Sequence, residues 1–141
     1  MLLFIYRAFL CVFFLISYAA VFATSTTTST TESLDGLQFK GETGEQGKGD
    51  HHEDTITFKD GQFRSVDCEN WGFGSAPYSV EQQGDSYHFS ATLLSPDRGK
   101  LEWKGTITGD TAKATFRWLH ERWYWNIDRQ YWFKGTRYTR P

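Results

Sequence analysis

Residues 101–118, LEWKGTITGDTAKATFRW, determine the fold of this chain. Gly109 and Asp110 lie at the centre of this segment, and such two-residue turns join antiparallel strands into tight hairpins. Folding the segment about the turn sets Trp103 opposite Phe116, with other apolar residues on the same face. Charged residues then share the opposite face: Lys100, Glu102, Lys104, Lys113 and Arg117. Turn chemistry and alternation agree, which predicts a β-hairpin with one buried face.

The same test succeeds at two other turns. Asp60 and Gly61 separate two alternating segments and pair Phe58 with Phe63. A turn at residues 84–85 aligns apolar residues on one face, in the pairs Gln82 with Tyr87, Val80 with Phe89, and Tyr78 with Ala91. Residues 95–99 form a longer connection to the next strand. If Ala91 lies opposite Trp103 across it, the apolar residues of both strands stay on the same face. These registers predict a continuous antiparallel meander.

The fold class predicted from this pattern is all-β, with eight antiparallel strands in sequential hairpins. The strands are expected near residues 36–43, 54–59, 62–66, 77–83, 86–94, 100–108, 111–120 and 129–138. An open meander of this length leaves two unpaired edges, whereas an up-and-down barrel removes them. Charge also favours closure. Residues 32–69 carry ten acidic and four basic side chains, whereas residues 98–141 carry four acidic and ten basic ones, and closure sets the first strand beside the last. A two-sheet β-sandwich is the alternative.

The first 23 residues have the pattern of a secretory signal peptide. Arg7 is followed by an uncharged apolar run that ends at Val21 and Ala23, which are small residues of the kind a signal peptidase needs. We expect cleavage after Ala23. The alternative is an uncleaved membrane anchor, since a span needs about 20 apolar residues. Residues 24–34 form a Ser/Thr-rich linker, and residues 35–141 suit a single β-barrel domain.

These features predict a secreted or periplasmic protein, or an N-terminally anchored one if the leader is retained. Contact with a membrane is expected only in the second case. No nucleic-acid partner is expected. The chain has 6 Trp, 7 Tyr and 12 Phe, but downstream of the leader its one cysteine is Cys68. The core is therefore expected to rest on aromatic burial, with Cys68 as an inert packed thiol or, alternatively, in an intermolecular disulfide.

The repeated strand pattern resembles the lipocalin-like, or calycin-type, barrels. It is carried by Phe58-Lys-Asp-Gly-Gln-Phe63, Tyr87-His-Phe89, Leu101-Glu-Trp103 and Tyr131-Trp-Phe133, and it covers residues 36–138. Lipocalins begin their first strand with Gly-x-Trp, whereas Gly36 is followed by Gln38 at that spacing, and their usual disulfide has no counterpart. The resemblance therefore implies a barrel interior that can bind a ligand, with no ligand contacts assigned to particular residues.

Few residues suggest catalysis or metal binding. The cluster Asp50-His51-His52-Glu53-Asp54 holds metal-ligand types, and His51 and His52 could chelate together only if they lie in a loop. A solvated acidic loop tip is the alternative, so His51 and His52 are weak metal candidates. No nucleophile lies beside a base, and no glycine-rich phosphate loop is present in the sequence. We expect a protein that is not an enzyme and needs no cofactor.

The leading functional hypothesis is an exported binding protein that holds a small apolar or aromatic ligand inside the barrel. The expected cavity-lining residues share the inward face of the later strands, with His120 as a polar contact: Phe89, Trp103, Phe116, Trp118, His120, Tyr131 and Phe133. The alternative is a solid barrel that contacts an envelope polymer, glycan or partner protein through its Trp/Arg-rich C-terminal end. Trp123, Tyr124 and Trp125 are the expected surface contacts, because three consecutive rings cannot all face inward.

Overall fold

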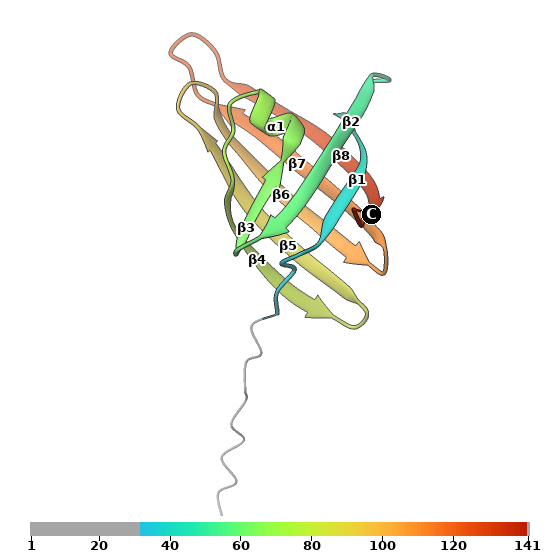
Figure 1. Cartoon of the computed structure of the whole chain (residues 1–141). Coiled ribbons are helices and arrows are strands. Elements are labelled where there is room, and N and C mark those ends of the chain that lie inside the picture. The colour runs from blue at the N-terminus through green and yellow to red at the C-terminus, as the bar shows by residue number, and fades with distance from the viewer. Residues whose placement is uncertain (1–31, 141) are drawn as a thin grey trace, which may run out of the picture.

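The computed structural model describes residues 32–140, which form a closed eight-stranded antiparallel β-barrel (Figure 1). This confirms the predicted all-β up-and-down barrel, and the sandwich alternative is wrong. The elements in chain order are β1 (Gln38–Glu45), β2 (His51–Lys59), β3 (Gln62–Ser65), α1 (Val66–Asn70), β4 (Ala76–Gln83), β5 (Ser86–Ser95), β6 (Gly99–Thr108), β7 (Thr111–His120) and β8 (Ile127–Arg137).

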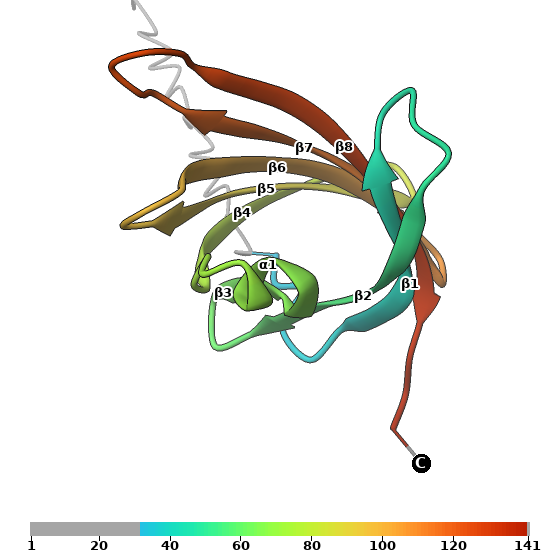
Figure 2. The same ribbon diagram turned by 90° about the horizontal axis from the view of Figure 1, so that it is seen from above.

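Each strand pairs with its neighbours in sequence, and β1 pairs with β8 to close the barrel. Seen from above, β4 to β8 form one wall while β1 to β3 lie across from it beside α1 (Figure 2). At the closing seam Gly41 lies opposite Gly135. A Cβ atom on Gly41 would lie 1.9 Å from the carbonyl oxygen of Lys134, so the strands meet more closely than a side chain permits.

The registers predicted from the turns are confirmed. Trp103 pairs with Phe116, Phe58 with Phe63, and Val80 with Phe89, while Ala91 pairs with Trp103 across the longer connection. Both central residues of the turn after β2 have positive φ, 53° at Asp60 and 73° at Gly61, as a type I′ turn requires. Local turn chemistry therefore fixes the register of this hairpin.

Two local features differ from the sequence prediction. Residues 66–70 form the short helix α1, which begins because the Ser65 hydroxyl accepts a hydrogen bond from the Cys68 backbone N–H. Five residues are too few to show a helical period, which is why the sequence pattern missed them. In addition, β2 begins at His51, so the expected loop position of His51 and His52 is wrong.

The core is built from rings that pack edge to face and in stacks. Phe58 contacts Phe63, Tyr78 and Phe89 at centroid distances of 5.3, 5.0 and 4.9 Å. Such pairs are more favourable than their buried area alone implies. The interior next to β3, β4 and β5 is therefore filled by the protein's own side chains.

The end of the barrel away from α1 is covered by the segment that leads into β1. Leu34 is 2% exposed and belongs to the core, although it is the last residue assigned to the linker. The Tyr78 hydroxyl accepts a hydrogen bond from the Leu34 N–H and donates one to Asp35. The predicted signal peptide lies outside the described residues, and within residues 32–140 no helix has the length and apolarity needed to cross a membrane.

Candidate functional site

A pocket of about 230 Å³ opens at the end of the barrel that carries α1. It lies above the packed core, between α1, the ends of β1 and β7, and the starts of β2, β6 and β8. Its lining combines aromatic rings with a few polar side chains: Thr43, His52, Asp67, Cys68, Trp71, Phe73, Arg98, Leu101, Phe116, Trp118, Arg129 and Tyr131. Such a mixture is typical of small-molecule sites.

A stack of three rings lies where the pocket meets the core. Phe116 stacks on Trp103 at a centroid distance of 4.1 Å and on Tyr131 at 5.0 Å, with interplanar angles of 13° and 7°. Trp103 is fully buried, while Phe116 and Tyr131 line the pocket. The stack therefore gives the pocket a flat aromatic surface whose position is fixed from below.

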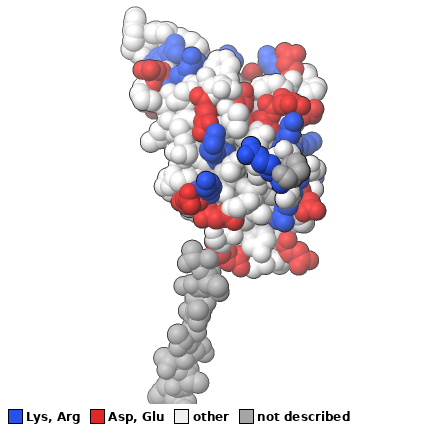
Figure 3. All heavy atoms as spheres, in the orientation of Figure 1, with Lys and Arg blue, Asp and Glu red and all other residues white. Residues whose placement is uncertain are grey.

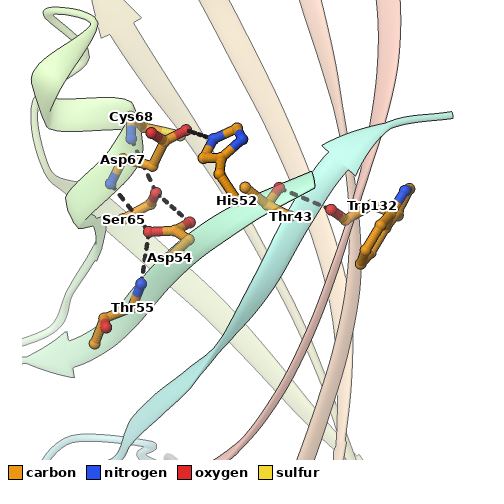
Figure 4. Close-up of polar contacts among 8 residues, drawn as sticks. All are labelled: Thr43, His52, Asp54, Thr55, Ser65, Asp67, Cys68 and Trp132. Carbon is orange, nitrogen blue, oxygen red and sulfur yellow. Dashed lines mark hydrogen bonds and ion pairs between the residues drawn. The ribbon is translucent and has the colours of Figure 1, made fainter. Parts of the chain in front are cut away.

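One wall of the pocket is α1, which a buried carboxylate holds in place (Figure 4). Asp54, on β2, accepts hydrogen bonds from the Ser65 hydroxyl at 2.7 Å and from the backbone N–H groups of Thr55 and Asp67 at 2.7 and 3.0 Å. Ser65 in turn caps the helix through Cys68. These bonds connect β2, β3 and α1, so the helix and the barrel wall form one rigid unit.

Burial raises the pKa of Asp54 above its ordinary value of 3.8, because a charged carboxylate loses hydration inside the protein. The three hydrogen bonds that it accepts oppose this effect, since they favour the ionised form. The negative charge of Asp67 nearby raises the pKa further. Asp54 is thus a structural carboxylate whose cost of burial is partly offset by its partners.

His52 reaches the pocket from β2, two residues before Asp54 on the same face. Its Nε2 lies 2.8 Å from a carboxylate oxygen of Asp67 on α1 (Figure 4). Thr43 faces the same space but donates its hydroxyl proton to the Trp132 carbonyl at 2.8 Å. His52 and Asp67 are therefore engaged with each other, and the Thr43 hydroxyl proton is used by the backbone.

The opposite side of the pocket presents the guanidinium of Arg98. This residue lies in the connection between β5 and β6, and its Cζ stacks 5.3 Å from the centroid of the Trp71 ring. Its carbonyl accepts a hydrogen bond from the Trp118 indole at 2.7 Å, which ties the connection to β7. Among residues 32–140 no carboxylate lies within 4 Å of the Arg98 guanidinium. A positive charge thus stands beside aromatic walls.

A second guanidinium, that of Arg129, lies at the start of β8. Its Nη1 is 3.7 Å from a carboxylate oxygen of Glu45. Burial raises the pKa of Tyr131, and Glu45 raises it further, while a hydrogen bond from Arg129 opposes both. Arg129 is therefore partly neutralised, which leaves Arg98 as the stronger attraction for an anion.

Cys68 lies at the inner end of α1, where burial raises the pKa of its thiol to about 12. The neighbouring charges of Asp54 and Asp67 act in the same direction, and the nearby polar side chains of Ser65 and Trp103 oppose it. The thiol is therefore protonated at neutral pH and free of any disulfide. Its burial disfavours the intermolecular bridge that the sequence left open.

The structure divides the predicted cavity residues between the pocket and the core, and places His120 in neither. Phe116, Trp118 and Tyr131 line the pocket. Phe89, Trp103 and Phe133 lie in the ring-packed core. His120 lies at the end of β7 and is half-buried, with an Nδ1 atom that has no hydrogen-bond partner in the described part of the chain, and it does not line this pocket.

The predicted surface contacts lie on the connection between β7 and β8, at the α1 end (Figure 1). Trp123 is 94% exposed, and its ring meets Tyr124 edge-on at 5.0 Å. Arg122 stacks on Trp125 at 5.4 Å and donates a hydrogen bond to the Tyr124 hydroxyl. Tyr124 and Trp125 are thus held by Arg122, while Trp123 projects into solvent.

His51 and His52 point to opposite faces of β2, because successive side chains alternate along a strand. His51 lies 3.9 Å from Glu42 on the outside, and His52 faces Asp67 in the pocket. Over residues 32–140 no three His, Cys, Asp or Glu side chains gather as a metal site would require.

Comparison with protein-family models, curated proteins and solved structures found no match to this chain.

Sequence reasoning missed most of the polar pocket residues. The strongest missed signal was Ser65, followed by Asp67 and Glu69, because a helix often begins with Ser and acidic residues in its first turn. The sequence places Arg98 in the long connection over residues 95–99 and does not indicate that it reaches a pocket. Closure places that connection at the same end as α1, and this could have been deduced from strand order.

Proposed function

We propose that this protein binds a small aromatic or apolar molecule with a single anionic group in the pocket beside α1. The observation that carries the proposal is Arg98, an unneutralised guanidinium that stacks on Trp71 and lines the same pocket as the Phe116 and Tyr131 rings. A carboxylate on the ligand would form charge-assisted hydrogen bonds with Arg98, and its apolar body would replace water against the rings.

The size of the pocket limits the ligand. Drug-sized ligands occupy sites of roughly 300–1,000 Å³, and this pocket holds about 230 Å³. A single ring with short substituents fits better than a long lipid or a haem. Because the core beneath is filled with rings, a longer ligand could extend only outward, past Trp71 and Trp118.

Calorimetric titration with benzoate and benzamide tests the proposal, because the two probes share a ring and differ in charge. We expect benzoate to bind about tenfold more tightly, the order of a charge-assisted hydrogen bond. Arg98→Gln should remove this preference and leave benzamide affinity unchanged. Arg137→Gln is the matched control, since Arg137 lies at the end of β8 that is remote from the pocket. Equal binding of the two probes to the native protein would contradict the anionic ligand.

A second candidate function is surface binding of an envelope polymer, glycan or partner protein through Trp123, Tyr124 and Trp125. The observation that favours it is the 94% exposure of Trp123, a large ring that meets Tyr124 only edge-on and leaves most of its surface to solvent. Chitotriose is a suitable probe for the glycan case. Saturable shifts of the Trp123 indole resonance that vanish in Trp123→Ala would support it, and an unshifted resonance would not.

We also propose that the barrel acts outside the cytoplasm, as a lipocalin-like exported protein. The apolar run that ends at Ala23 supports export, and the closed barrel architecture supports the likeness. N-terminal sequencing of protein isolated from its own host should find a start near Thr24. A start at Met1 would contradict cleavage.

A further inference from the structure

A second concave surface lies on the outside of the barrel wall, across β4 to β8. It is an open depression of about 760 Å³ that shares no lining residue with the pocket beside α1. Small inward residues lie beneath its centre, where Gly105 pairs with Ala114. A Cβ atom on Gly105 would lie 2.4 Å from the Phe89 ring, so this ring packs against the backbone beneath the depression.

Three lysines project into this depression from adjacent strands. Lys113 on β7 lies directly opposite Lys134 on β8, and Lys104 on β6 lies diagonally across from Lys113, because its direct partner is Thr115. Direct and diagonal neighbours on one sheet face have Cβ atoms about 5 and 7–8 Å apart. Lysine side chains are long enough to span these separations, so the three ammonium groups can surround one small anion.

The three lysines form no ion pair with a carboxylate of the protein. None of the three lysines lies within 4 Å of a carboxylate oxygen in the described chain. Glu81 is the one acidic residue in the lining, and it lies beside His88 on β5. Of the acidic side chains just outside, Glu102 is engaged by Lys100 at 2.8 Å and Glu42 lies across from Lys134.

The arrangement is electrostatically unfavourable in the free protein. Like charges placed directly opposite on a sheet destabilise it, as Lys113 and Lys134 are. By contrast, the face that Figure 3 shows has acidic and basic side chains interspersed. A bound anion would relieve the repulsion on the lysine surface.

We propose that Lys104, Lys113 and Lys134 form a binding site for a phosphate group. A phosphate ester carries a charge of about −1.5 to −2 near neutral pH, which is opposite in sign to the three lysines of a depression whose lining holds one carboxylate, that of Glu81. Lysine ammonium groups bind phosphate as point charges with several donors. Further donors lie in the depression, including the hydroxyls of Ser90 and Thr115. Lys134 also stacks on Trp132, with its Nζ 5.7 Å from the ring centroid, which limits the positions of its side chain.

Exposure sets the expected strength of the site. Charges in contact with water are screened, so affinity for a single phosphate should be weak and should fall as salt concentration rises. Each Lys→Gln change should weaken binding by about 3- to 10-fold, as loss of one charge-assisted contact does. Removing all three should abolish it.

An NMR titration with inorganic phosphate, at constant ionic strength, tests the site. We expect saturable shifts of backbone amides in β6, β7 and β8, and none in the variant Lys104→Gln/Lys113→Gln/Lys134→Gln. Lys59→Gln is the control, because Lys59 is an exposed lysine at the end of β2. The spectrum of the triple variant without phosphate reports whether it folds, and relief of repulsion predicts an unchanged or higher Tm.

The source of the phosphate group is distinguished by a parallel titration with phosphatidylcholine vesicles that contain phosphatidic acid. Vesicle binding that the triple variant loses identifies a lipid headgroup, whereas response to inorganic phosphate alone identifies a soluble phosphate ester. Either result supports the site. Absence of saturable shifts with phosphate, or shifts that persist in the triple variant, would overturn it. So would vesicle binding that all variants share.

Discussion

Trp103 and Phe116 stack with their ring centroids 4.1 Å apart, and this contact is the boundary between the filled core and the open pocket. Trp103 is 1% exposed, with Phe63 on its other side at 5.0 Å. Trp103→Ala should lower the free energy of unfolding by about 3–5 kcal/mol, because it leaves a large cavity. Trp123→Ala is the control and should change it by less than about 0.5 kcal/mol. Urea denaturation measures both, and equal effects would contradict this assignment of the core.

The seam where β1 pairs with β8 leaves no room for a side chain at Gly41. Gly41→Ala would place a Cβ atom 1.9 Å from the Lys134 oxygen and 2.4 Å from the Gly135 Cα. Both neighbours are backbone atoms that cannot rotate away, so we expect a loss of about 3 kcal/mol or more. Gly49→Ala meets nothing within 4 Å and should be nearly neutral. Thermal unfolding of the two variants distinguishes a closed seam from an open one, in which Gly41→Ala would be tolerated.

The buried carboxyl group of Asp54 should make the stability of the protein depend on pH. Its pKa is raised in the folded state, so the folded protein binds this proton more tightly than the unfolded chain. The stability contributed by Asp54 is therefore fully present below pH 3.8, the ordinary pKa of the group, and is lost as pH rises through the raised pKa of the folded state. We subtract the free energy of unfolding of Asp54→Asn from that of the native protein. This difference should fall as pH rises from 3.8 through the raised pKa. A difference that is constant or rises with pH would contradict a raised pKa.

The thiol of Cys68 should be inert in the folded protein. Its pKa of about 12 and its burial both suppress the reactive thiolate. We expect no reaction with dithionitrobenzoate at pH 8 until denaturant is added, and then modification of one thiol per chain. The protein should carry Cys11→Ser so that the leader contributes no signal. Rapid modification of the folded protein would show that α1 opens readily.

Much of the fold could be predicted because local rules and global closure agree. At Gly109 the turn residue, the alternating apolar positions and the outward charges all specify one register, and Trp103 meets Phe116 as a consequence. Closure by β1 and β8 followed from the cost of free edges. Residue identity and the period of two along each strand are enough for both predictions.

The site could be predicted only in part, because it depends on contacts between distant segments. Trp118 and Tyr131 were found by alternation, but Arg98 and Asp67 reach the pocket from a connection and a helix that have no strand period. The proposed phosphate site of Lys104, Lys113 and Lys134 likewise depends on a contact between distant segments. Lys104 and Lys113 were recognised as outward residues of one hairpin, and Lys134 joins them only through the pairing of β7 with β8.

An NMR screen with a library of small anionic aromatic fragments tests the proposed binding of such molecules in the pocket beside α1. We expect hits that shift the indole resonances of Trp71 and Trp118 and that bind about tenfold more weakly to Arg98→Gln, in line with loss of a charge-assisted hydrogen bond. Fragments that leave both indoles unshifted throughout the library would contradict it.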